Sequence, residues 1–183
     1  NSYPFYLTVA GRGEEAVDVA RRAFDRDPLS ASRSHILAVQ LLLNGRRDEA
    51  IEECRRTIGI DPNFAVAHEV LGSLLGRKGL YPEALGAARQ AVALSRGGAM
   101  SLANLGYVQA RAGQPAEARL VLQQLAEAAK QRYTPGFAFA IVHLGLGEHD
   151  QALGWLEKAY EERFPRLAYL RREPMWAPLR EDP

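Results

Sequence analysis

The sequence predicts an all-α solenoid of about five helix–turn–helix repeats, followed by a C-terminal capping helix. The first observation is a spacing of 34 residues that continues along the chain without insertions. The second is that four separate registers keep this spacing, which is the signature of a repeat architecture. The third is that no run of alternating apolar and polar residues indicates a β-strand.

Each of the four registers has a physical role in a pair of helices. A glycine recurs between two helical stretches, where the turn needs a residue that tolerates positive φ. An alanine opens the second helix, where a small side chain permits close packing. In the first helix a large apolar residue lies beside a small one, which leaves a gap for the neighbouring helix. The four registers are Gly11, Gly45, Gly79, Gly113 and Gly147; Ala16, Ala50, Ala84, Ala118 and Ala152; Tyr3, Leu37, Leu71, Leu105 and Phe139; and Pro4, Ala38, Gly72, Gly106 and Ala140.

The registers predict the helices in order along the chain. Pro28 and Pro62 each follow an aspartate and close a repeat, because proline cannot continue a helix interior. Thr134 is predicted to cap a helix that begins at Pro135, a favoured residue at the first helical position. The predicted helices are residues 4–10, 14–26, 31–44, 47–59, 65–78, 81–94, 99–112, 115–131, 135–146 and 149–163.

The N-terminal end is a truncated copy of the repeat. Residues 1–10 lack the opening positions of the first helix. We expect Phe5 and Leu7 to be exposed unless upstream sequence covers them. The chain is therefore expected to be a piece of a longer protein.

The C-terminal end leaves the 34-residue pattern, so we divide the chain into an array at 1–163 and a cap at 164–183. A solenoid must hide its terminal apolar face, and the cap is predicted to cover the last repeat. The apolar residues expected to lie over that repeat are Leu167, Leu170, Trp176 and Leu179. The charged residues expected to face water are Arg166, Arg171, Arg172 and Glu173.

The repeat unit resembles the tetratricopeptide repeat (TPR) family. In the copy at 31–64 the matching positions hold Leu37, Ala38, Leu41, Gly45, Ala50, Cys54 and Pro62. The resemblance implies a right-handed superhelix that binds proteins or peptides, without catalysis and without a cofactor. The C-terminal end resembles that of TPR arrays in multidomain bacterial signalling and regulatory proteins. We therefore expect the interaction domain of a larger bacterial regulatory protein in the cytoplasm.

By the same resemblance, the first helices form a concave groove that holds the partner. The residues that point into it are expected to be His35, Val39, Leu42, Val66, Glu69, Ser73, Arg77, Met100, Ala103, Tyr107, Arg111, Phe137 and Ile141. Arg77 and Arg111 hold the same position in adjacent repeats and should lie side by side. Arginine pairs with carboxylates through two hydrogen bonds, which favours a partner with an acidic group. The alternative is that both arginines pair with Glu69 or Glu83 and bind nothing.

The sequence contains no recognisable active site. His68 and Glu69 begin a helical zinc-protease motif, but Gly72 stands where the second histidine is needed. Cys54 lies in a register that holds alanine in other copies, so we expect a small core residue rather than a nucleophile. The residues thus predict no enzyme, no metal and no cofactor.

Charge argues against nucleic acid and membranes as general partners. The 23 lysines and arginines are balanced by 22 aspartates and glutamates, for a net charge of +1. Adjacent arginines such as Arg55 and Arg56 are expected on a solvated face with nearby acids. Apolar groove residues mark an interface but do not identify its partner, so homo-oligomerisation and docking within the protein stay open.

Overall fold

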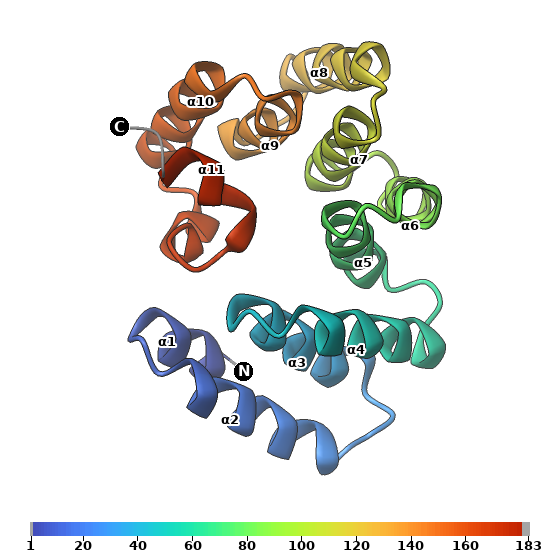
Figure 1. Cartoon of the computed structure of the whole chain (residues 1–183), viewed down its shortest axis with the longest axis vertical. Helices are drawn as coiled ribbons and strands as arrows, with labels where there is room; N and C mark the ends of the chain where they lie inside the picture. The colour runs from blue at the N-terminus through green and yellow to red at the C-terminus, as the bar shows by residue number, and fades with distance from the viewer. Residues whose placement is uncertain (1, 181–183) are drawn as a thin grey trace.

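The computed structural model describes residues 2–180, which form helices stacked in consecutive pairs (Figure 1). Asn1 and the last three residues of the predicted cap, 181–183, lie outside the described residues. The repeat helices are α1 (Tyr3–Val9), α2 (Gly13–Asp25), α3 (Ala31–Leu43), α4 (Arg47–Ile60), α5 (Ala65–Arg77), α6 (Tyr81–Leu94), α7 (Ala99–Arg111), α8 (Pro115–Ala129), α9 (Gly136–Leu146) and α10 (His149–Glu161). Every predicted helix is present, with its ends within one or two residues of the prediction. The predicted α-solenoid is confirmed.

The glycine register makes the turn inside each repeat. Gly11, Gly45, Gly79, Gly113 and Gly147 all have positive φ, between +75° and +84°. This left-handed conformation places a side chain against its own backbone in other residues, so glycine adopts it at the lowest cost. The turns are therefore nearly identical, and each second helix leaves its first helix in the same direction.

Small residues set how closely the helices approach. A Cβ atom at Gly72 would lie 3.1 Å from the backbone nitrogen of Ala88 and 3.2 Å from the carbonyl oxygen of Ala84, both in α6. A Cβ atom at Gly106 would lie 3.0 Å from a methyl carbon of Val142 in α9. Ala84 itself is fully buried. The predicted gap beside each apolar knob is confirmed at these crossings.

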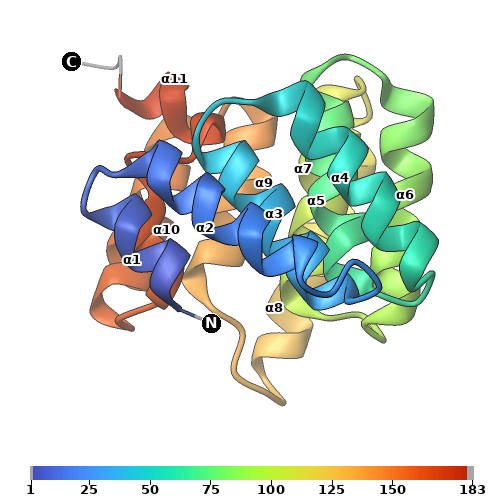
Figure 2. The ribbon, with the colours of Figure 1, turned by 90° about the horizontal axis from the view of Figure 1, so that it is seen from below.

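The stack curves until its two ends meet. In Figure 1 the repeat helices follow a ring, and the C-terminal residues lie between α9 and α1. Figure 2 shows α1 beside the same C-terminal residues from a second direction. The rings of Phe5 in α1 and Tyr169 in the C-terminal residues are 5.7 Å apart in an edge-to-face contact. The chain thus forms a nearly closed ring.

This closure changes the prediction for the N-terminal helix. Leu7 has no exposed surface and Phe5 is half-buried, because α1 packs against α2, α3 and the C-terminal residues. The expected exposure of these two side chains is therefore wrong. The exposed apolar residues of α1 are instead Tyr3, Tyr6 and Val9.

The predicted capping helix is two short 3₁₀ turns and one helical turn. These are η1 (Pro165–Tyr169), η2 (Pro174–Trp176) and α11 (Ala177–Arg180). Trp176 packs on Phe137 of the last repeat, as predicted, with ring centroids 5.2 Å apart. Arg171 and Arg172 are exposed, as predicted. Glu173 was expected to face water, but it is 7% exposed and accepts a hydrogen bond from Arg166, so that expectation is wrong.

The start of α9 also differs from the prediction. The helix begins at Gly136, with Pro135 as the N-cap residue, and the Thr134 hydroxyl makes no capping bond. Instead, the carboxylate of Glu162 accepts a hydrogen bond from the backbone N–H of Gly136 at 2.9 Å. A carboxylate at a helix N-terminus satisfies a free donor and interacts favourably with the helix dipole. The cap therefore comes from a residue far along the chain.

We predict that Gly72→Leu severely destabilises the array. The new side chain would meet backbone atoms of α6, which cannot move aside as the end of a flexible side chain can. Overpacking of a tight core costs about 1–3 kcal/mol, and backbone on two sides places this change at the upper end or above. The thermal midpoint should fall by about 6–12 °C.

The matched control is Gly86→Leu in the middle of α6. A Cβ atom there meets nothing within 4 Å, and leucine favours helix more than glycine does by about 0.8 kcal/mol. This variant should melt at or slightly above the wild-type temperature. Equal melting of the two variants in circular dichroism would contradict the packing account.

Candidate functional site

The predicted groove residues come together on the inner face of the ring. They lie on the first helices α3, α5, α7 and α9. All of them except Ala103 and Phe137 line one or more of three neighbouring pockets on this face. Ala103 and Phe137 are fully buried. The concave surface is therefore continuous along the first helices, with Phe137 covered at one end.

What covers the groove is the chain's own C-terminal segment, residues 164–180. Residues of this segment line all three pockets opposite the first helices. Arg166 and Glu173 lie against Leu42, Glu69 and Val70, while Pro174 and Met175 lie against Tyr107 and Leu144. The sequence indicated that this segment packs on the array, but not that it enters the groove.

Trp176 is the apolar anchor of the segment. It is 1% exposed and packs against the ring of Phe137, which also contacts Phe164 at a centroid distance of 5.2 Å. Buried aromatic rings of this kind cost about 3–5 kcal/mol when truncated to alanine. Met175 beside it is 7% exposed. This end of the segment therefore contributes a large share of its attachment.

Arg166 is the polar anchor. Its guanidinium lies 3.5 Å from a carboxylate oxygen of Glu69 and 3.2 Å from one of Glu173. It also lies over the Phe137 ring, 5.5 Å from the centroid. Burial raises the pKa of Glu69, while Arg166 and the hydroxyl of Ser101 act in the opposite direction. Loss of the guanidinium would leave two carboxylates in a poorly solvated site, which is costly.

His35 lies at the N-terminal end of the same site. Burial is the main cause that lowers its pKa to about 4, and the positive charge of Arg166 adds to it. The imidazole ring lies 5.3 Å from the ring of Phe64. His35 is therefore neutral at physiological pH, and its buried Nδ1 atom has no hydrogen-bond partner among the described residues.

Arg77 and Arg111 line an open pocket of about 250 Å³ at the other end of the groove, together with Tyr107 and Pro178. Among residues 2–180 neither arginine forms a salt bridge. Glu69 pairs with Arg166, and Glu83 lies 3.4 Å from Arg55, so the alternative of pairing with those two acids is wrong. Burial lowers the pKa of Arg77, and nearby Arg47 lowers it further. This pocket therefore holds two guanidinium groups and no acidic lining residue.

Comparison with known proteins places this architecture in a family. Sequence models described as tetratricopeptide repeat match residues 9–63 and 70–133, and another matches residues 140–158. The chain belongs to the tetratricopeptide repeat family. No match was found among curated proteins. A TPR array is a scaffold for protein interactions.

Solved structures share the TPR fold. TTC0263 of Thermus thermophilus is 24% identical, with a TM-score of 0.69 over 94% of this chain and 95% of that one. PilF of Pseudomonas aeruginosa is 21% identical, with a TM-score of 0.64 over 99% and 82%. YrrB, described as a TPR protein with an unusual peptide-binding site, is 19% identical, with a TM-score of 0.56 over 93% and 88%. At these identities the likeness is one of fold.

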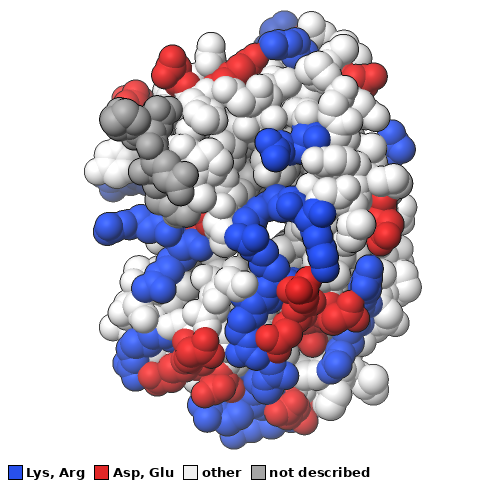
Figure 3. Space-filling view, viewed as in Figure 1, with Lys and Arg blue, Asp and Glu red and all other residues white. Residues whose placement is uncertain are grey.

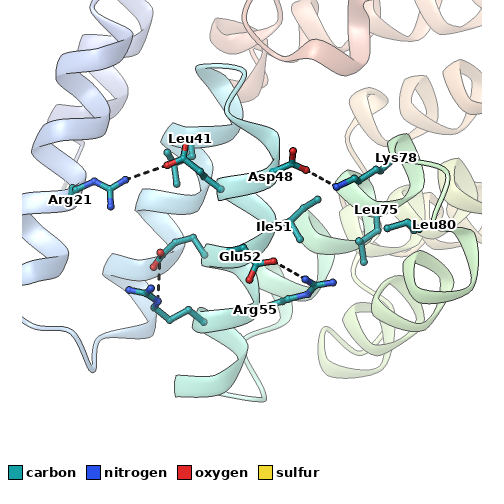
Figure 4. Close-up of a pocket in the computed structure, with 12 residues that line it drawn as sticks. Arg21, Leu41, Asp48, Ile51, Glu52, Arg55, Leu75, Lys78 and Leu80 are labelled. Atoms are coloured by element: carbon teal, nitrogen blue, oxygen red, sulfur yellow. Dashed lines mark hydrogen bonds and ion pairs between the residues drawn. The ribbon is translucent and has the colours of Figure 1, made fainter.

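The outer face of the TPR array has a larger pocket, of about 400 Å³, with a different character (Figure 4). Its charged residues neutralise one another: Lys78 bonds Asp48 at 2.7 Å, and Arg55 bonds Glu52 at 2.7 Å. Basic and acidic side chains also lie next to one another in the lower half of Figure 3. The expected salt-bridged outer face is confirmed for these residues. Exposed pairs of this kind contribute little stability each.

The remaining chemistry-bearing residues have structural environments. Cys54 is buried, and burial raises the pKa of its thiol to about 12, so it is an unreactive core residue as expected. The carboxylate of Glu148 lies 2.7 Å from both His143 and Arg119. The described residues include no cluster of three or more potential metal ligands, and none of their helices is long and apolar enough to cross a membrane.

We predict that His35 makes the stability of the TPR array fall on acidification. Between pH 6.5 and about 4 the unfolded chain binds a proton at His35 that the folded chain does not bind. The free energy of unfolding therefore decreases as the pH falls through this window. In His35→Leu this contribution is absent. The free energy of unfolding of the wild type minus that of the variant should therefore decrease from pH 7 to pH 4.

Urea unfolding of both proteins at five pH values measures this difference. The raised pKa of Glu69 acts with the opposite sign, because a folded carboxyl that holds its proton adds stability that is lost as the pH rises. That contribution is present in both proteins and largely cancels in the comparison. Stability curves that run parallel between pH 7 and pH 4 would contradict the assignment of a buried neutral His35.

Proposed function

We propose that this chain is a non-catalytic module that binds a peptide or protein segment in its concave groove. In this proposal residues 1–163 are the binding array and residues 164–183 its cap. The observation that supports it is the C-terminal segment itself, a stretch of short turns that the first helices hold through side-chain contacts. A surface that accommodates Trp176 and Arg166 in this way is suited to other non-helical segments. The likeness in fold to YrrB, described as having a peptide-binding site, agrees with this.

We place an acidic group of the partner in the pocket of Arg77 and Arg111. Two guanidinium groups without acidic partners in the described residues attract a carboxylate, and each can donate two parallel hydrogen bonds. The apolar groove residues, such as Val39, Leu42 and Ile141, provide contact area beside it. The setting we propose is the cytoplasm, within a larger bacterial regulatory protein, with no nucleic acid or membrane as partner.

A second candidate is self-association or docking within the full-length protein. The exposed side chains of Tyr3, Tyr6 and Val9 on α1 favour it, since a row of apolar residues on one helix face is suited to an interface. Light scattering separates the two candidates. A self-associating scaffold would not be observed as a 20.2 kDa monomer.

We predict that the double charge reversal Arg77→Glu with Arg111→Glu abolishes partner capture through the groove. Carboxylates in place of two guanidiniums repel an acidic segment, and the amount captured from a lysate of the source organism should fall at least tenfold. Quantitative mass spectrometry of the captured proteins measures this loss.

The matched control is Arg22→Glu with Arg89→Glu. These arginines are exposed on the second helices α2 and α6, so the change in net charge is the same but lies outside the groove. Capture by the control should equal that of the wild type. If all three proteins capture the same partners in the same amounts, the groove is not the binding surface.

A further inference from the structure

The C-terminal segment, residues 164–180, fills the place that a ligand of the groove would take. We propose that this segment is an internal ligand that a partner displaces, and that the partner presents the same two groups, a cation for Glu69 and an aromatic ring for Phe137. This inference rests on the proposed function, in which the groove is the binding surface. It adds the chemistry of the partner and a closed state of the module.

The two anchors come from opposite ends of the segment; both contact the ring of Phe137, and Arg166 also reaches a second repeat. Arg166 pairs with Glu69 on α5, and Trp176 packs against Phe137 on α9. The segment therefore spans the groove across the ring rather than covering one helix pair. A cap that only shielded the last repeat would have no reason to place an arginine on α5.

The segment is attached to the groove by side chains. Backbone N–H groups at Leu167, Glu173 and Trp176 donate within the segment, to Phe164, Tyr169 and Glu173, and Phe164 donates to Ala159 of α10 where the segment begins. The first helices have satisfied their own backbone groups through helical bonds. Release of the segment therefore breaks side-chain contacts that another segment can replace, and leaves the helical hydrogen bonds of the array in place.

The junction with the array allows such a release. Helix α10 ends at Glu161, and Arg163 follows with a φ of +53°, a left-handed conformation that ends the helix and turns the chain towards the groove. Arg163 is exposed. In the proposed release, the chain turns away from the first helices at this junction and Phe164 leaves the ring of Phe137.

The site left behind would select a cation and an aromatic ring. Glu69 keeps its position without the segment, because Ser101 donates to its carboxylate at 3.3 Å and Asn104 donates to its carbonyl oxygen at 2.9 Å. Phe137 has no exposed surface while Trp176 and Phe164 cover it. A poorly solvated carboxylate attracts a cation, and an uncovered ring favours an aromatic partner.

A fluorescently labelled peptide of residues 164–180 tests this in trans. It is titrated into the full wild-type chain and into the full chain with Trp176→Ala, which weakens the internal segment. The peptide should bind the variant at least tenfold more tightly than the wild type, because its site is no longer occupied. Addition of Glu69→Gln to the variant should weaken binding at least fivefold.

Peptide variants test the chemistry of the partner. A peptide with Arg166→Lys should keep binding, whereas one with Arg166→Glu or Trp176→Ala should lose it. If all four peptides bind alike, or if the wild-type peptide binds both proteins with equal affinity, the inference is overturned.

A milder protein variant, Tyr169→Ala, repeats the test in case the Trp176→Ala protein does not fold. Tyr169 is only half-buried and contacts Phe5, so its removal loosens the segment without opening the core. Circular dichroism should show unchanged helix content, and the peptide should bind at least threefold more tightly than to the wild type. No gain in a folded Tyr169→Ala protein would count against an internal ligand.

The outcomes separate this inference from the proposed function. If the peptide fails to bind the loosened chains while the Arg77 and Arg111 reversal still abolishes partner capture, the segment is a structural cap and the groove remains the binding surface. If the peptide fails and the reversal has no effect, both the inference and the proposed function are wrong.

Discussion

At Gly72 and Gly106 the first helices approach their neighbours so closely that a single added carbon would lie 3.0–3.2 Å from atoms already present. This close approach recurs because the sequence repeats its small residues every 34 positions. The glycine turns are nearly identical from one repeat to the next, and stacking of one repeated helix pair is how a solenoid acquires its curvature. The curvature is what brings Phe5 to within 5.7 Å of Tyr169 and forms the groove.

The groove that results is too apolar to be left uncovered without cost. Phe137, Ile141 and Tyr107 lie on its inner surface and are buried, and Trp176 of the C-terminal segment packs on the ring of Phe137. The same segment introduces Arg166 and Glu173 into this poorly solvated space. Their pairing with Glu69 offsets the cost of burying charge but adds little net stability, as is usual for buried ion pairs. What such a pair provides is a defined position for the segment.

The charges of Arg166, Glu173 and Glu69 also suit a segment that binds the groove reversibly. An apolar cap of the same volume would stabilise the array more, because it would not require three charged groups to lose water. Equivalent side chains on a partner can replace the side-chain anchors of the segment. A row of backbone hydrogen bonds between the segment and the array would be harder to replace. At the far end of the groove, Arg77 and Arg111 lie in a pocket that the segment borders but does not neutralise.

The sequence predicted what depends on local and periodic signals. Helix ends, turn glycines such as Gly79 and the inward position of residues such as Met100 all follow from the repeat, because each copy repeats the same physical solution. The burial of Cys54 followed from its register. The groove residues follow from their register on the first helices, and their binding role stays a prediction.

Apart from the short turns that replace the predicted capping helix, the errors concern contacts between residues far apart in the chain. Leu7 is buried and Phe5 half-buried because the ring closes, and Glu173 is buried because Arg166 reaches Glu69 on another repeat. The N-terminus of α9 is capped by Glu162 rather than by Thr134 for the same reason. Local sequence contains no signal for the total curvature of the stack, and a small change in the angle at each crossing would place these residues apart.

Amide hydrogen exchange of the full chain, followed by mass spectrometry, tests the central claim most directly. If residues 164–180 are an internal ligand of an independently folded array, their amides should exchange through a local opening that leaves α5, α7 and α9 protected. If the segment and the array exchange together, in one global unfolding event, the segment is an inseparable part of the core and the account is contradicted.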